Sequence, residues 1–252
     1  MAGRTFTKII QTVSSGLFIL LFSCAFFTGS AFAQKGSTAV GLQYKPIFPA
    51  AFLGTGKQSS QSGVVTFNVE LKSGFCGGMV VRHSFSDILA FETGINYVKR
   101  KYDLTIEDGD FKGPSEFRII GYEIPISLLV YIQLGEKLFM NASMGPGVDM
   151  FASNVQSYDE YFQHVSFRKN LFQASVLANL GWEWRTEKSG YLYLGASYHR
   201  PFSYIYLTKV EYRYRGKDEL TDQKLLGNYL TLDLRYFFPE NKTKRAGSNN
   251  PN

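Results

Sequence analysis

The chain has 252 residues, of which 44% are hydrophobic and 16% aromatic, and its formal net charge is +6. This mild charge comes from basic residues spread along the chain, which excludes a dedicated nucleic-acid surface with clustered lysines and arginines. Beyond residue 33 no apolar run reaches the ~18 residues that a transmembrane helix needs, so a membrane location would depend on strands.

The first 33 residues predict a signal peptide. Arg4 and Lys8 form a basic start, an apolar stretch follows, and Ala31-Phe32-Ala33 matches a cleavage site. The alternative is a lipoprotein cut before Cys24, which the bulky Phe22 disfavours. Cleavage after residue 33 leaves 25 basic against 21 acidic residues, a net charge of +4, and one cysteine, so no intrachain disulfide can form.

After the leader, apolar side chains alternate with small or polar ones in a series of segments, which is the period of β-strands. In chain order the predicted strands are residues 38–45, 74–83, 89–103, the two arms of a hairpin across 117–151, then 171–185, 191–202 and 228–238. Four long connections are predicted as loops, at residues 46–62, 103–115, 152–169 and 216–224. Three short turns alternate with them, and residues 239–252 form a polar tail that we expect to be disordered. Alternation also continues in residues 64–71 and 204–215, which we interpret as extensions of the second and seventh strands beyond the membrane.

The hairpin across residues 117–151 shows most clearly the length and the two-faced pattern of these strands. Each arm exceeds an ordinary strand of about 5–6 residues, with one apolar face and one small, polar face. Such arms suit a membrane-spanning barrel. Residues 34–238 therefore predict an all-β, eight-stranded antiparallel up-and-down transmembrane β-barrel in the cell outer membrane, with short periplasmic turns and long extracellular loops.

Aromatic residues near the strand ends predict a girdle at the lipid interface, formed on the periplasmic side by Tyr131, Trp182, Trp184, Tyr236 and Phe238. The alternative fold is a soluble lipocalin-like barrel or sandwich with its apolar face inside. The face opposite the apolar one is rich in Gly, Ser and Asn with single charges, which fits a crowded lumen better than a solvated exterior.

Seven charged residues fall on the predicted inward face. An eight-stranded barrel is just wide enough for side chains to fill, and buried charges must be paired. We therefore expect a polar network that closes the lumen, formed by Arg82, Glu92, Glu123, Asp149, Glu183, Asp233 and Arg235. A conducting path is the alternative.

Catalytic and metal-binding patterns are weak. His164 lies in a predicted loop near Asp159, Glu160 and Ser166, but neighbours in a flexible loop do not fix the geometry of a catalytic triad. His199 faces the lumen, where a polar network explains it better than a general base. We expect no enzyme activity, no cofactor and no metal site; an outer-membrane acyltransferase or protease is the alternative.

Three motifs resemble the PorT-like outer-membrane barrels of Bacteroidota-type Gram-negative bacteria. They are Tyr122-Glu123-Ile124-Pro125 at the start of a long apolar strand, Gly145-Pro146-Gly147 in the next, and the final Leu234-Arg235-Tyr236-Phe237-Phe238. The resemblance covers residues 37–238 and implies a role in protein secretion or envelope assembly, although fold alone does not give function.

The expected function is that of a non-enzymatic barrel in contact with outer-membrane lipid, which binds a protein of the envelope or secretion machinery through its loops or turns. Tyrosines in the predicted loops favour this view, since tyrosine is enriched at binding surfaces. Aromatic anchoring at lipid headgroups explains them equally well. The alternative function is a narrow channel or carrier for small solutes.

Overall fold

The computed structural model describes residues 36–49, 54, 56–186, 189–214 and 216–239. The regular elements among them are β-strands, and no helix in these ranges is long and apolar enough to cross a bilayer. The predicted signal peptide lies outside the described residues, as does nearly all of the predicted tail. Both assignments stay predictions.

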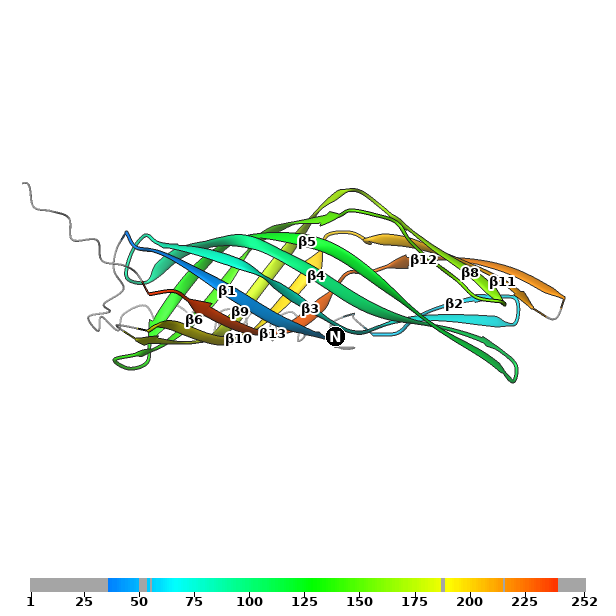
Figure 1. Ribbon diagram of the computed structural model, residues 1–252, viewed down its shortest axis with the longest axis horizontal. Helices are drawn as coiled ribbons and strands as arrows, with labels where there is room; N and C mark the ends of the chain where they lie inside the picture. Colours follow the sequence, from blue (N-terminus) through cyan, green and yellow to red (C-terminus); the bar gives the residue numbers. More distant parts are fainter. Residues whose placement is uncertain (1–35, 50–53, 55, 187–188, 215, 240–252) are drawn as a thin grey trace, which may run out of the picture. The chain divides into compact units, whose positions relative to one another are not determined.

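Eight antiparallel strands form a closed barrel, which confirms the predicted fold (Figure 1). They follow one another around the barrel in the order β1, β13, β10, β9, β6, β5, β4, β3, and pairing of β1 with β3 closes the ring. The strands are β1 (Thr38–Phe48), β3 (Val65–Ser84), β4 (Leu89–Asp108), β5 (Phe111–Gln133), β6 (Leu138–Phe151), β9 (Phe172–Thr186), β10 (Gly190–Pro201) and β13 (Tyr229–Phe237).

Five further strands lie beyond the barrel. Four of them lie in segments expected to be long loops, where that prediction was wrong, and the fifth lies in residues 204–215, which alternation predicted to extend above the membrane. These strands are β2 (Gln58–Ser62), β7 (Val155–Tyr158), β8 (Phe162–Arg168), β11 (Tyr206–Tyr214) and β12 (Lys217–Leu225). The last four form a second sheet in the order β12-β11-β8-β7, while β2 pairs with β3. The expected loop at residues 103–115 is a tight hairpin of β4 and β5 around Gly109. We call these five strands, with residues 65–71, 102–108 and 111–117, the extension.

Side-chain polarity inverts between the barrel and the extension. In the barrel the outer face is aliphatic, with Leu128 and Leu180 about half exposed, whereas the inner face carries buried charges. In the extension the inner face holds the main apolar core, which includes Phe67, Leu104 and Val210. A register shift between Leu71 and Ser73 in β3 marks the change in that strand. An apolar band outside and charges inside suit lipid around the barrel and water around the extension, which rules out the soluble alternative.

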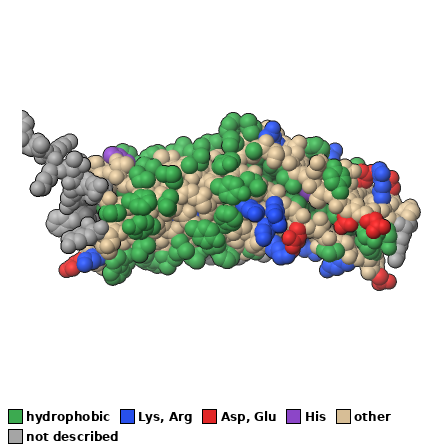
Figure 2. Space-filling view, in the orientation of Figure 1, with side chains coloured by type: hydrophobic (Ala, Val, Ile, Leu, Met, Phe, Trp, Pro, Cys, Tyr) green, Lys and Arg blue, Asp and Glu red, His purple; other side chains and the backbone are tan. Residues whose placement is uncertain are grey.

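Figure 2 shows the apolar band on one face of the molecule, with charged side chains at the far end of the extension. Four of the predicted girdle residues lie on this outer face, each between about a third and just over half exposed: Trp182, Trp184, Tyr236 and Phe238. Tyr131 does not, and its assignment was wrong. Its side chain is 4% exposed and points into the lumen, where its ring lies 4.7 Å from the Arg185 guanidinium. Position near a strand end does not decide the face; alternation along the strand does.

The Gly145-Pro146-Gly147 segment of β6 lies close to the backbone of β5. Backbone pairing runs from Pro125–Gly147 to Leu128–Met144 with a gap between them, where Pro146 has no N–H to donate. A Cβ placed on Gly145 would lie 1.9 Å from the carbonyl oxygen of Ile126, so the two backbones would have to separate.

We therefore expect Gly145→Ala to destabilise the barrel by about 1–3 kcal/mol, the usual cost of overpacking. Gly135→Ala is the matched control, because Gly135 lies in a turn and its Cβ would meet no atom within 4 Å. Urea unfolding of the protein in lipid vesicles measures both. Equal unfolding midpoints for the two variants would contradict the close approach.

Candidate functional site

A network of ion pairs crosses the lumen near the short turns. Arg82 of β3 donates from Nε and Nη2 to Glu92 Oε2 of β4, at 3.0 and 2.8 Å, and from Nη1 to Glu183 of β9. Arg235 of β13 bridges Glu92 and Asp233, with Nη2 2.6 Å from Asp233 Oδ2. These five side chains are at most 7% exposed. We call them the lumen network; the structure brings together five of the seven predicted residues.

Aromatic rings cover the arginines of the lumen network. The Arg82 guanidinium lies 4.1 Å from the Phe237 ring centre, and that of Arg235 lies 4.7 Å from the ring of Tyr193. Arg185 lies 4.2 Å from the ring of Phe139 and donates from Nε to Glu183 at 2.5 Å. Cation–π contacts of this kind are strongest where water is excluded, so rings and carboxylates together fill this part of the lumen.

The other two predicted residues form a second cluster, closer to the extension. His199 Nε2 of β10 lies 3.0 Å from Asp149 of β6 and 3.6 Å from Glu123 Oε2 of β5. Tyr229 Oη donates to Glu123 Oε2 at 2.7 Å, and Asn96 Nδ2 donates to Oε1 at 2.8 Å. His199 therefore belongs to a polar network, as its inward position suggested.

Glu123, Asp149 and His199 are the described residues that could hold a metal ion, since one ligand atom from each lies within 4.8 Å of the others. The geometry does not require one, because the imidazole already lies between the two carboxylates and both Glu123 oxygens accept hydrogen bonds. The absence of a metal site stays a prediction.

The predicted set of seven lumen charges leaves out other cations that lie in the lumen, although alternation along the first strand places Lys45 inward. Lys45 Nζ of β1 lies 3.5 Å from Asp233 Oδ2, and Arg100 of β4 is 2% exposed, with its guanidinium 4.8 Å from the Tyr229 ring centre. Arg100 lies within the predicted strand at residues 89–103, and the alternation that places Glu92 inside places Arg100 inside as well. With these two and Arg185, five bases face five acids among the lumen residues that the structure describes: Lys45, Arg82, Arg100, Arg185 and Arg235 against Glu92, Glu123, Asp149, Glu183 and Asp233. The formal charges of these ten side chains balance.

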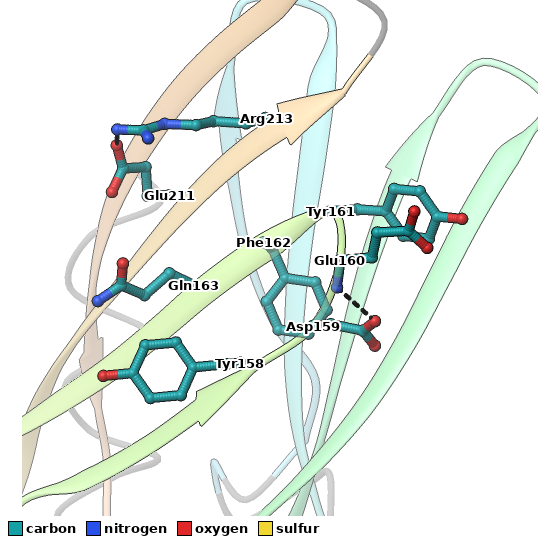
Figure 3. Close-up of a pocket in the computed structure, with 8 residues that line it drawn as sticks. All are labelled: Tyr158, Asp159, Glu160, Tyr161, Phe162, Gln163, Glu211 and Arg213. Atoms are coloured by element: carbon teal, nitrogen blue, oxygen red, sulfur yellow. Dashed lines mark hydrogen bonds and ion pairs between the residues drawn. The ribbon is translucent and has the colours of Figure 1, made fainter.

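A pocket of about 200 Å³ lies on the extension, between the β7–β8 turn and β11 (Figure 3). Its lining residues are Tyr158, Asp159, Glu160, Tyr161, Phe162, Gln163, Glu211 and Arg213. Arg213 forms an ion pair with Glu211, and Asp159 Oδ1 accepts a hydrogen bond from the Glu160 backbone at 2.7 Å. Ligand pockets usually measure about 300–1,000 Å³. This one has room for a single side chain of a protein rather than for a whole small molecule.

Aromatic packing fixes the turn that forms the pocket. The Tyr161 ring lies edge-on to Phe111 of β5, with centres 5.3 Å apart, and to Tyr214 of β11, with centres 4.7 Å apart. The negative charge of Glu160 raises the pKa of Tyr161. These contacts join the β7–β8 turn to β5 and β11, so the pocket rests on packed strands, whereas the sequence predicted a flexible loop.

His164 and Ser166 are close enough to resemble part of a catalytic triad, with Nε2 2.8 Å from Ser166 Oγ. However, the other ring nitrogen faces a hydroxyl, Ser157 Oγ at 3.0 Å, in place of the carboxylate that orients a catalytic imidazole. His164 and Ser166 are both 0% exposed, inside the extension. Asp159 and Glu160 line the pocket instead, so the four residues do not form one site.

An antiparallel eight-stranded barrel with an apolar outer band and a charged, filled lumen defines an outer-membrane β-barrel protein, so the short turns are periplasmic and the extension is extracellular. The chain belongs to the outer membrane protein beta-barrel domain family, whose model matches residues 32–207.

A solved structure shows the same fold. The outer membrane protein OprG from Pseudomonas aeruginosa has 12% sequence identity and a TM-score of 0.52, over 82% of this chain and 97% of that chain. The outer membrane protease OmpT from Escherichia coli has 12% identity over 84% of this chain and 99% of that chain, with a TM-score of only 0.28. No curated relative matches the sequence.

Proposed function

We propose that this outer-membrane barrel does not conduct solutes and serves as a binding component, with the extension as its working part. The observation that carries the proposal is the folded extension itself. Its strands pack around an apolar core that includes Tyr206 and Tyr212, so it presents a fixed surface above the membrane. Binding by a preformed surface avoids the entropic cost of ordering a loop.

The pocket supports a protein as the partner. Tyr158 is 64% exposed beside it, and the Arg213 side chain is 69% exposed. Tyrosine and arginine are enriched at protein interfaces and among the residues that dominate binding energy. A role in secretion or envelope assembly is the finer part of the proposal, and it rests on the resemblance to PorT-like barrels.

Site-specific photocrosslinking in intact cells tests the binding role. A crosslinking amino acid at Tyr158 is expected to form a discrete protein adduct, whereas one at the lipid-facing Trp182 is not. Tyr158→Ser combined with Arg213→Ser should weaken that adduct and impair secretion or envelope integrity while the barrel still folds. Unchanged secretion and envelope in the double variant, without a specific adduct, would contradict the proposal.

A conductance measurement separates the binding component from a narrow channel or carrier. Because the side chains of the lumen network are at most 7% exposed and fill the lumen near the short turns, we expect the purified protein to show no stable, ion-selective conductance in planar bilayers. A reproducible unit conductance from the folded, heat-modifiable protein would favour the channel. An open porin in the same bilayers is the positive control.

A further inference from the structure

Two neighbouring rows of charged side chains cross the outer face where β4 and β5 leave the barrel. In the row farther from the membrane, Asp103 of β4 lies directly opposite Glu116 of β5. Lys72 of β3 bridges the two acids, with Nζ 3.1 Å from Asp103 Oδ2 and 3.3 Å from Glu116 Oε1. Like charges directly opposite each other destabilise a sheet, and here a side chain of opposite sign offsets the repulsion.

The next row toward the membrane repeats the arrangement with the opposite sign. Lys101 of β4 lies directly opposite Arg118 of β5, and Lys99 follows two residues further along β4 on the same face. Arg118 is exposed and the two lysines are half-exposed. None of the three forms an ion pair with an acid in the part of the chain that the structure describes. Three cations therefore share one surface without the counter-charge that the acidic row receives from Lys72.

The height of Lys101 and Arg118 above the membrane indicates which anions they can meet. A chain of rings marks the outer interface: Tyr44 and Phe75 have centres 6.0 Å apart, Phe75 and Tyr97 5.9 Å, and Tyr97 and Tyr122 6.0 Å. Lys101 and Arg118 lie four residues beyond Tyr97 and Tyr122 along their strands. At about 3.4 Å per residue and a strand tilt of about 35–45°, that is roughly 10 Å above the rings, in the headgroup layer.

Figure 2 shows lysine and arginine side chains gathered where the apolar band ends and the charged surface of the extension begins. We propose that Lys99, Lys101 and Arg118 form a binding site for the negatively charged phosphate of an outer-leaflet lipid headgroup. One phosphate group between Lys101 and Arg118 would do for this row what Lys72 does for the acidic one. Arginine suits phosphate because its guanidinium donates two parallel hydrogen bonds, while lysine adds a mobile point charge.

Native mass spectrometry of the purified full chain tests the site, with lipid A, a glycolipid that carries two phosphate monoesters, as the probe and phosphatidylcholine as the neutral comparison. The wild-type protein should bind lipid A in preference to phosphatidylcholine. Lys101→Gln combined with Arg118→Gln should bind lipid A about 30-fold more weakly, since each basic residue near an anionic surface contributes about 1 kcal/mol. Both residues point outward, so heat-modifiability of the variant should be unchanged.

Lys112→Gln combined with Lys209→Gln is the matched control. It removes the same charge from the extension, where each lysine already faces an acid, Glu107 and Asp222, at 3.8 Å. Its affinity for lipid A should stay within about twofold of wild type, because these two lysines lie in the extension and already pair with acids. Exposed ion pairs of this kind contribute little free energy, so losing them should not destabilise the protein. Equal loss in both double variants, or no loss at Lys101 and Arg118, would overturn the site. Displacement of lipid A by equimolar inorganic phosphate would overturn the assignment to a lipid.

Discussion

Replacing Arg82 with alanine is expected to cost about 3–5 kcal/mol of unfolding free energy, because it leaves a buried network with uncompensated charge. Arg82 contacts both Glu92 and Glu183, whose side chains are 7% and 0% exposed. Without it, four lumen bases face five acids. The cavity left beside the Phe237 ring adds to the loss.

Urea unfolding in lipid vesicles measures this loss through tryptophan fluorescence. Trp182 and Trp184 lie on the outer face, about half exposed, so their emission reports departure from lipid. Lys112→Ala removes a cation whose Nζ lies 3.8 Å from exposed Glu107, and we expect it to cost at most about 1 kcal/mol. A similar, small loss in both variants would show that the lumen network does not hold the barrel together.

The combination of Arg82→Leu with Glu183→Leu separates charge pairing from packing. Replacing both partners of a buried pair by apolar residues is often neutral or stabilising, whereas removing one partner leaves a charge unpaired. Here Arg185 and Glu92 would each lose one contact but keep other partners: Arg185 stays over the ring of Phe139, and Glu92 keeps Arg235. The double variant should therefore be more stable than Arg82→Ala; a double variant that is less stable would contradict the charge argument.

The barrel was predictable from the sequence because alternation fixes the face of each residue once a strand is recognised. All seven predicted lumen charges are buried. The ion-pair partners of these charges were harder to predict from the sequence. Arg82 and Glu92 face each other across a short turn, so hairpin register could have paired them. Contact of Arg82 with Glu183, 101 residues away, depends on closure of the ring, and no local pattern reports that.

Only part of the extension was predictable in the same way. Residues 64–71 and 204–215 alternate, whereas the inward side chains elsewhere in the extension are not uniformly apolar. In β12 the buried residues are Thr221, Gln223 and Leu225, while Leu220 points outward. The short strand β2 consists only of glutamine and serine, and it is held by pairing with β3 and by side-chain bonds such as Ser62 Oγ to Glu219 at 2.6 Å. Strands of this composition depend on tertiary pairing more than on their own pattern.

The extension is also expected to lose stability in acid, through His164. The imidazole is 0% exposed and lies against the Phe117 ring, with centres 4.4 Å apart. Its nitrogens meet only hydroxyls, Ser157 Oγ and Ser166 Oγ, and Ser166 in turn bonds Thr208 Oγ1 at 2.8 Å. No carboxylate pairs with the ring in the described part of the extension, so burial lowers the pKa of His164 to about 4.

The direction of the pH effect follows from the two pKa values. In the unfolded chain an imidazole titrates near 6.5, so between about pH 6.5 and 4 the unfolded state binds more protons than the folded one. The contribution of neutral His164 is complete above about pH 6.5 and falls progressively toward pH 4. The total loss is on the order of 3 kcal/mol.

Hydrogen exchange of β8 and β11, corrected for the intrinsic pH dependence of exchange, measures this loss locally and separately from the lumen carboxylates. His164→Gln keeps hydrogen-bonding groups but cannot titrate, so its protection should vary little between pH 6.5 and 4. His83→Gln is the matched control, because that ring lies on the outer face beside Phe85 and far from the extension. It should retain the wild-type pH profile. Equal profiles for wild type and His164→Gln would place the acid sensitivity of the extension in its exposed ion pairs instead.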